Sequence, residues 1–104
     1  MIARVLVDRE KIVAFCGKWK IEELSLFGSV LRDDFGPESD IDVLVTFHPD
    51  AAWTLLDQSR METELSQLFG RRVDLVSRRA VESSENWLRR DAILASAEPF
   101  HAAR

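Results

Sequence analysis

The sequence predicts an α/β (α+β) fold, in which a small mixed sheet is flanked by helices. Apolar residues recur at helical spacing in two stretches, residues 9–20 and 51–69. Three short apolar segments, at 23–27, 40–47 and 72–77, have the length and composition of strands. The 104 residues, 46% of them hydrophobic, suffice for one small domain, which we expect to span residues 1–104.

The first helix is expected to begin at Arg9, with Asp8 as its N-cap. Four residues at i, i+3, i+4 and i+7 form its apolar stripe: Ile12, Phe15, Cys16 and Trp19. Cys16 is the single cysteine, so an internal disulfide and a cysteine-based zinc site are excluded. We expect Cys16 to be a small buried hydrophobe.

The first strand, 23–27, is expected to place Leu24 and Leu26 on one face. Gly28 and Ser29 would end it, and a helical turn at 30–32 and a loop at 33–39 would follow. In the second strand, 40–47, one face would carry Ile41, Val43 and Val45, and the other Asp40, Asp42 and Leu44.

The longest helix is expected over 51–69, and Gly70 ends it. Its stripe consists of Met61, Leu65, Leu68 and Phe69. Trp53 lies off this stripe, so it either packs internally or marks a surface for a partner. In the third strand, 72–77, Val73 and Leu75 would share one face and Asp74 would lie on the other.

A last helix is expected after Ser83 or Ser84, either of which could cap it. Leu88, Ala92 and Ala95 would share its buried face, and Pro99 would end it. The residues after Pro99 are expected to form a loose tail.

Composition limits the classes of partner. The formal net charge of −4 argues against direct binding of nucleic acid through a broad basic surface. No apolar run approaches the length of a membrane span, and the apolar stretch at the N-terminus is too short for a secretory signal. Because the single cysteine also fits a reducing compartment, we expect a cytoplasmic protein without membrane contact.

The Gly28–Ser29 turn is a candidate phosphate site. Glycine lets a phosphate approach the backbone, and the free N–H groups at the start of a helix face the anion. The Ser29 hydroxyl would add another donor. The alternative is an ordinary turn at the end of a strand.

Asp40 and Asp42 are candidate ligands for Mg²⁺. Alternation along a strand points both carboxylates the same way, where they repel each other. Hard divalent cations bind carboxylate oxygens and remove that repulsion. A solvent-facing strand edge is the alternative, but the apolar flanks indicate a central, mostly buried strand, in which an uncompensated carboxylate pair is costly.

Asp74 is the third candidate. If its strand lies beside the strand of Asp40 and Asp42, three carboxylates meet and can bind two Mg²⁺ ions, the arrangement used for in-line attack on phosphorus. One ion would activate the attacking hydroxyl and the other would hold a triphosphate. For Asp74 alone, an ion pair with Arg71 or Arg72 is the alternative.

The pattern Gly28-Ser29-x-x-Arg32, followed by Ser39-Asp40-Ile41-Asp42 and the later Asp74, resembles the nucleotidyltransferase superfamily of the DNA polymerase β type. Within it the chain is similar to the minimal nucleotidyltransferases, the MntA-like antitoxins of HEPN-domain toxins. This resemblance implies a polymerase-β-like palm fold and Mg²⁺-dependent transfer of AMP from ATP to a hydroxyl, with release of pyrophosphate. The acceptor would be a tyrosine of the partner HEPN toxin.

The resemblance also implies a role for each matched residue. Gly28 and Ser29 would bind the β- and γ-phosphates, and Arg32 would approach phosphate or brace the loop. Two Mg²⁺ ions would be held by three carboxylates, those of Asp40, Asp42 and Asp74, and Asp74 would also take the proton of the incoming hydroxyl. The chain could form a hetero-oligomer with the toxin or a homo-oligomer with further copies of itself.

Asp33 departs from the family pattern, because many members have glycine directly after the arginine of the motif. In this chain a second aspartate, Asp34, follows Asp33. Two extra negative charges near a triphosphate favour an alternative, a catalytically weak or inactive antitoxin that neutralises its toxin by binding alone. A second alternative is a transferase that modifies a small molecule such as an antibiotic. The short chain argues against it, because no domain is left to hold that acceptor.

Overall fold

The computed structural model describes residues 8–28 and 40–102, which contain eight helices and strands. In chain order these are α1 (Arg9–Lys18), β1 (Ile21–Phe27), β2 (Ile41–Phe47), α2 (Leu55–Phe69), β3 (Val73–Ser77), α3 (Arg78–Glu82), α4 (Trp87–Ser96) and β4 (Glu98–Ala102). The helical turn expected at 30–32 and the loop expected at 33–39 lie outside the described residues. The predicted small mixed sheet flanked by helices is confirmed.

The strands are arranged in the order β3-β2-β1-β4. β1 pairs antiparallel with β2 and with β4, whereas β2 pairs parallel with β3. The strand that carries Asp42 is therefore central in the sheet, as the sequence predicts, and β3 lies beside it at one edge.

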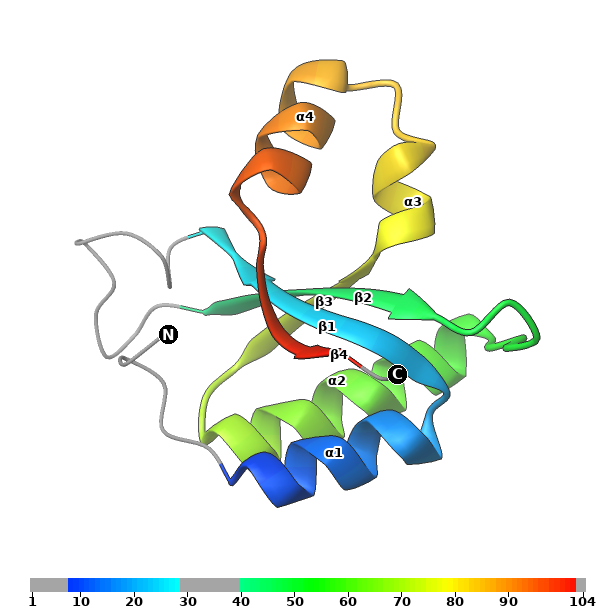
Figure 1. The fold of residues 1–104 in the computed structure, drawn as a ribbon, viewed down its shortest axis with the longest axis vertical. Coiled ribbons are helices and arrows are strands. Elements are labelled where there is room, and N and C mark those ends of the chain that lie inside the picture. Colours follow the sequence, from blue (N-terminus) through cyan, green and yellow to red (C-terminus); the bar gives the residue numbers. More distant parts are fainter. Residues whose placement is uncertain (1–7, 29–39, 103–104) are drawn as a thin grey trace.

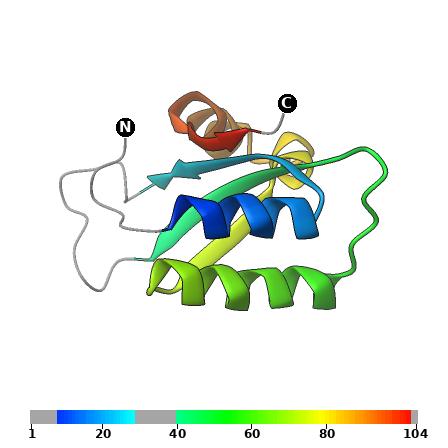
Figure 2. The same cartoon turned by 60° about the horizontal axis from the view of Figure 1, so that its bottom comes forward.

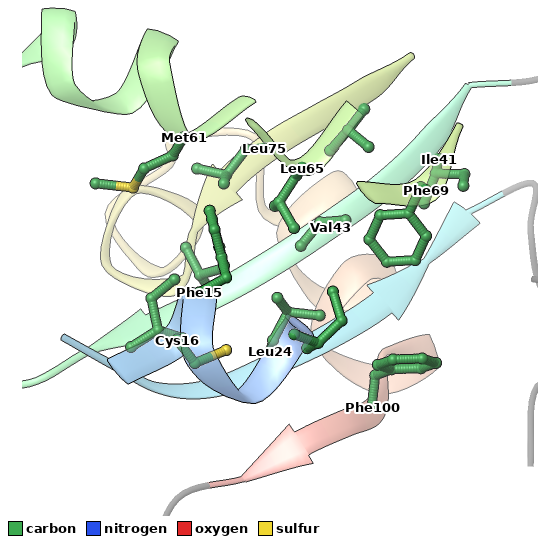
Figure 3. Packing of buried hydrophobic residues seen from close by; sticks show 14 of the residues in the cluster. Phe15, Cys16, Leu24, Ile41, Val43, Met61, Leu65, Phe69, Leu75 and Phe100 are labelled. Carbon is green, nitrogen blue, oxygen red and sulfur yellow. The ribbon is translucent and has the colours of Figure 1, made fainter. Parts of the chain in front are cut away.

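Helices cover both faces of this sheet (Figures 1 and 2). α1 and α2 lie side by side on one face, and α3 and α4 lie on the other. The larger core lies under α1 and α2, where Cys16, Leu24, Val43 and Leu65 are among the buried side chains (Figure 3). A smaller cluster under α3 and α4 consists of Phe27, Leu44, Val81 and Ile93. Among the described helices, none has the length and apolar composition to cross a bilayer.

Two sequence predictions about the α1 side of the core hold. Ile12, Phe15 and Cys16 are buried, and burial raises the pKa of the Cys16 thiol to about 12, so the thiol stays protonated and inert. The half-buried Trp53 ring meets the Trp19 ring edge-on, with 5.1 Å between centroids, and its Nε1 donates to the Trp19 carbonyl at 2.8 Å. Trp53 thus packs internally, in agreement with the first of its two alternatives.

The prediction of a loose tail after Pro99 is wrong, because this segment forms β4 and pairs with β1. Proline is tolerated there because β4 is an edge strand. Phe100 holds the strand: its ring is 9% exposed and packs 6.1 Å from the Phe69 ring, centroid to centroid. Arg9 adds a cation–π contact at 4.5 Å from the Phe100 ring centroid and donates to the Phe100 carbonyl at 3.2 Å.

The start of α2 differs from the prediction. The helix begins at Leu55 rather than Ala51, because Thr54 is its N-cap and forms a capping box with Asp57. The Thr54 backbone N–H and then its hydroxyl, both donating to the carboxylate, lower the pKa of Asp57.

The last helix also differs. α4 is capped by Asn86, not by Ser83 or Ser84, and the short helix α3 precedes it with Ser77 as its N-cap. The three residues expected on the buried face of α4 are exposed: Leu88, Ala92 and Ala95. The helix packs on the sheet through Ile93 instead, so the sequence pattern indicated the wrong stripe.

Replacing Phe100 with alanine should lower the free energy of unfolding by about 3 kcal/mol, because a buried aromatic ring is removed and a cavity remains. Urea denaturation measures the change. Val13→Ala is the matched control, since Val13 is 53% exposed and its truncation should cost less than about 0.5 kcal/mol. Equal effects of the two substitutions would mean that β4 is not anchored by Phe100.

Glu64 joins α1 to α2, because its carboxylate accepts hydrogen bonds from Trp19 Nε1 at 2.7 Å and Lys18 Nζ at 3.0 Å. Burial alone would raise the pKa of Glu64, but these hydrogen bonds outweigh it and bring the pKa below the ordinary value of 4.5. A lowered pKa in the folded state means that the ionised form stabilises the fold at neutral pH. This contribution is lost as the pH falls through the folded-state pKa.

Glu64→Gln should therefore lower the free energy of unfolding by about 1 kcal/mol at neutral pH. The difference from the wild-type protein should be smaller at acidic pH than at neutral pH, because the wild-type side chain becomes protonated as the pH falls through its lowered folded-state pKa. Urea denaturation across this pH range measures it. A difference of the same size at both pH values would contradict the role of the charge.

Candidate functional site

Asp42 and Asp74 are register partners across the parallel pair β2–β3. Phe27 is the partner of Asp42 on the other side, in β1. Because neighbouring strands lie about 4.8 Å apart, this row places the two aspartates side by side. The predicted adjacency of the two strands is therefore confirmed.

Both aspartates face the α3–α4 side of the sheet. Their neighbours Ile41 and Val43 in β2, and Val73 and Leu75 in β3, belong to the core under α1 and α2, so Asp42 and Asp74 point the opposite way. Asp42 is half-buried, whereas Asp74 and Asp40 are exposed.

The prediction of a buried carboxylate pair at Asp40 and Asp42 thus holds only in part. The β2 strand is central, but both aspartates lie where it begins: Asp40 directly precedes the strand, and Asp42 is its second residue, beside Phe27 of the cluster that α3 and α4 cover. In Figure 1 this is the end of the sheet where β1 ends and β2 begins, away from the α3 end of β3.

Gly28 follows β1 directly and lies against Asp42. Its φ of +75° is a conformation that glycine adopts without strain. A Cβ atom at this position would overlap the Asp42 carboxylate. Glycine is thus needed twice here, for the backbone turn and for the close approach of the carboxylate. Ser29 and Arg32, predicted to act with Gly28, lie outside the described residues.

Two neighbouring carboxylates on one face repel each other and favour a cation between them. Within the described part of the chain, no ion pair joins Asp74 to Arg71 or Arg72, the alternative considered for this residue. Residues 8–28 and 40–102 also contain no group of three His, Cys, Asp or Glu side chains placed to hold a metal ion.

The pair of carboxylates nevertheless fits Mg²⁺. This ion keeps several waters and binds proteins through one or two carboxylates plus the phosphates of a substrate, rather than through a complete protein cage. Asp42 and Asp74 supply two hard oxygen donors on adjacent strands, and Asp40 lies two residues before Asp42. The phosphates of a nucleotide would complete the coordination.

A cavity of about 480 Å³ lies at the opposite end of β2 and β3. Three of its lining residues already bond within the chain: Arg78 Nε donates to Thr46 Oγ1 at 3.1 Å, and Ser77 Oγ accepts from the Ala80 N–H. Arg78 also pairs with Glu23 at 3.5 Å. The neighbouring carboxylates that suit a metal ion lie at the aspartate end of the sheet rather than at this cavity.

Sequence reasoning missed two polar residues of α2, Glu62 and Ser66, whose side chains accept hydrogen bonds from the backbone of β3. Each follows a stripe residue directly, Met61 or Leu65, so the two lie four residues apart on the flank of the buried face. That spacing is the sequence signal that could have indicated them.

A small mixed sheet with neighbouring carboxylates beside a glycine turn is an arrangement suited to metal-assisted transfer on phosphates. The sequence matches the nucleotidyltransferase domain family over residues 9–98, and the chain belongs to this family. The prediction of an enzyme of the nucleotidyltransferase class is confirmed.

Two curated relatives carry related names. The chain is 30% identical over 82 residues to MJ1217 of Methanocaldococcus jannaschii, a predicted protein adenylyltransferase, and the match covers 79% of this chain and 80% of that protein. It is 35% identical over 66 residues to the protein adenylyltransferase MntA of Thermococcus cleftensis, covering 64% of this chain and 65% of that protein.

Solved structures share the fold. A predicted minimal nucleotidyltransferase superposes with a TM-score of 0.67 at 36% identity, over 88% of both chains. A complex of the tri-AMPylated HEPN toxin of Shewanella oneidensis with its MNT antitoxin matches with a TM-score of 0.60 at 20% identity, over 90% of this chain and 69% of that chain. The predicted resemblance to minimal nucleotidyltransferases is confirmed.

Three glycines allow a test of the contact between Gly28 and Asp42. Gly28→Ala should lower the free energy of unfolding by about 2 kcal/mol or more, because it combines the strain of a positive φ with displacement of the carboxylate. Gly70→Ala has the same kind of φ, +68°, but open space, and should cost about 1 kcal/mol. Gly17→Ala, in α1 with open space, should stabilise by about 0.5 kcal/mol.

Urea denaturation of the three variants measures these differences. If Gly28→Ala costs no more than Gly70→Ala, the Asp42 carboxylate does not press against Gly28.

Proposed function

We propose that this protein is a Mg²⁺-dependent protein adenylyltransferase, which transfers AMP from ATP to a tyrosine hydroxyl of a partner HEPN toxin and so acts as its antitoxin. The observation that carries the proposal is the register pairing of Asp42 with Asp74 beside Gly28, in a chain that belongs to the nucleotidyltransferase domain family. The names of the relatives support AMP as the transferred group.

In this proposal Asp40, Asp42 and Asp74 hold two Mg²⁺ ions. Gly28 and Ser29 bind the β- and γ-phosphates of ATP through backbone N–H groups and the hydroxyl, and Arg32 contacts phosphate. The bound ions would neutralise the triphosphate and lower the pKa of the acceptor hydroxyl.

The transfer is an in-line displacement at the α-phosphorus of ATP. The acceptor oxygen forms a bond to the α-phosphorus. The bond from the α-phosphorus to the oxygen that bridges it to the β-phosphate breaks, so pyrophosphate leaves. The acceptor proton passes to the Asp74 carboxylate. Asp74 suits this role because it is exposed on an edge strand, where the side chain of another protein can reach it.

The α3–α4 side of the sheet supports a protein as the acceptor. Trp87 and Leu88, at the beginning of α4, are 58% and 65% exposed, and exposed aromatic side chains are enriched on surfaces that meet a partner. The helix lies on the sheet face to which Asp42 and Asp74 point. The fold shared with an MNT antitoxin that accompanies an AMPylated HEPN toxin supports the same class of partner.

Neutralisation by binding alone remains the second candidate. The expectation that Trp53 marks a surface for its partner falls away, since Trp53 packs against Trp19. The residues that favour binding alone, Asp33 and Asp34, lie outside the described residues.

The test is incubation of the protein with ATP labelled in the α-phosphate, Mg²⁺ and the HEPN toxin encoded beside it. Label should pass to the toxin, and chelation of Mg²⁺ should abolish transfer. Asp42→Asn should slow transfer at least about 10²-fold, because one of two adjacent carboxylates is lost. Asp50→Asn should transfer normally, because Asp50 is 75% exposed and pairs with Lys20 away from the aspartate end of β2.

Asparagine has the size of aspartate, and urea denaturation of the Asp42→Asn variant checks that it folds, so that a defect in transfer can be separated from unfolding. Transfer by Asp42→Asn at the wild-type rate would contradict the catalytic proposal. Protection of cells by this variant without any label transfer would favour the binding-only alternative.

A further inference from the structure

β3 is an edge strand of the sheet, so one side of its backbone meets β2 and, among the described residues, no strand lies on the other side. The Arg72 carbonyl accepts a hydrogen bond from the Ile41 N–H at 2.9 Å. Backbone groups alternate between the two sides of a strand. The backbone N–H and C=O groups of Asp74 therefore face β2, as those of Arg72 do, whereas Val73 and Leu75 direct their N–H groups to the outer edge.

Those two outward N–H groups donate to side chains of α2. The Leu75 N–H donates to Glu62 Oε2 at 2.9 Å, and the Val73 N–H donates to Ser66 Oγ at 3.0 Å. Asp74 is therefore flanked on both sides by residues whose backbone is tied to α2.

Ser66 is connected further. Its Oγ donates to the Glu62 carbonyl at 2.7 Å, and its own carbonyl accepts hydrogen bonds from the N–H groups of Gly70 and Arg71, in the turn that leads into β3. Helix, turn and strand thus form one hydrogen-bonded unit in which little sliding of β3 along α2 is possible.

The apolar pattern alone does not fix this register. A slip of β3 by one residue would turn Val73 and Leu75 out of the core, which their burial opposes. A slip by two residues keeps both side chains inside, because alternation has a period of two, yet it moves Asp74 by about 7 Å along β2. The hydrogen bonds to Glu62 and Ser66 oppose the two-residue slip, because each requires a particular N–H group.

We propose that Glu62 and Ser66 are positioning residues, which hold β3 in the register that sets the Asp74 carboxylate beside Asp42. The proposal rests on the proposed function, because its consequence is the binding of a divalent ion by this pair. Neither residue touches the reacting atoms in this account. They act on the site through the backbone of Val73 and Leu75.

The test compares Glu62→Ala with Glu62→Gln, which retains an oxygen able to accept the Leu75 N–H. Glu64→Ala is the matched control: it removes a glutamate from the same helix, but one that bonds to Trp19 and Lys18. Two quantities are measured for each protein: the exchange rate of the Leu75 amide hydrogen, and the affinity for Mn²⁺ in the presence of ATP by electron paramagnetic resonance.

Glu62→Ala should speed exchange of the Leu75 amide at least tenfold and weaken Mn²⁺ binding about tenfold, and Glu62→Gln should recover most of both. Glu64→Ala should lower the melting temperature without weakening Mn²⁺ binding. If Glu62→Ala fails to fold, Ser66→Ala removes the other anchor with the loss of a single oxygen and should weaken Mn²⁺ binding in the same direction.

Unchanged Mn²⁺ affinity in a folded Glu62→Ala or Ser66→Ala variant would overturn the positioning role and leave the proposed function intact. An equal loss of affinity in Glu64→Ala would also overturn it, since the effect would then follow general stability. No Mn²⁺ binding by the wild-type protein would contradict the proposed function and this inference together.

Discussion

The parallel pairing of β2 with β3 is the constraint on which the rest of the site depends. It joins two segments that are far apart in the sequence, and it sets Asp42 opposite Asp74. A parallel pair needs a crossover connection, and α2 supplies it while covering the core face of both strands. The same helix therefore contributes to the hydrophobic core and to the register of the edge strand.

The adjacent carboxylates of Asp42 and Asp74 oppose stability, because like charges repel each other. Apolar neighbours on the other face of the same strands, such as Ile41 and Val43, anchor β2 in the core and make the repulsion tolerable. At the other end of the same sheet face, Arg78 bonds to Thr46 and Glu23, so this arginine is paired within the chain. The side-by-side carboxylates of Asp42 and Asp74 are what single out the end where β2 and β3 begin.

Alternation along strands was enough to predict the inner and outer faces of β2 and β3, and with them the direction of Asp42 and Asp74. The burial of Phe100 was not predicted, because Pro99 was expected to end the last helix and to be followed by a loose tail. Proline is, however, compatible with an edge strand such as β4. The exposed face of α4 was misjudged because Leu88 and Ile93 are equally apolar in sequence, and only the packing distinguishes them. The spacing of Glu62 and Ser66 beside the buried stripe of α2 could have indicated polar contacts, but their partners, the Leu75 and Val73 N–H groups, are known only from the packing of α2 against β3.

If a divalent ion binds with its nucleotide where β1 ends and where β2 and β3 begin, Mn²⁺ in the presence of ATP should broaden the backbone amide resonances at that end of the sheet. We expect the amides of Gly28, Asp42 and Asp74 to broaden together at the lowest Mn²⁺ concentrations. At those concentrations the amides of Phe47 and Ser77, about 10–16 Å further along β2 and β3, should keep their intensity. Broadening centred on Phe47 and Ser77, or absent from all five residues, would show that the ion binds elsewhere or not at all.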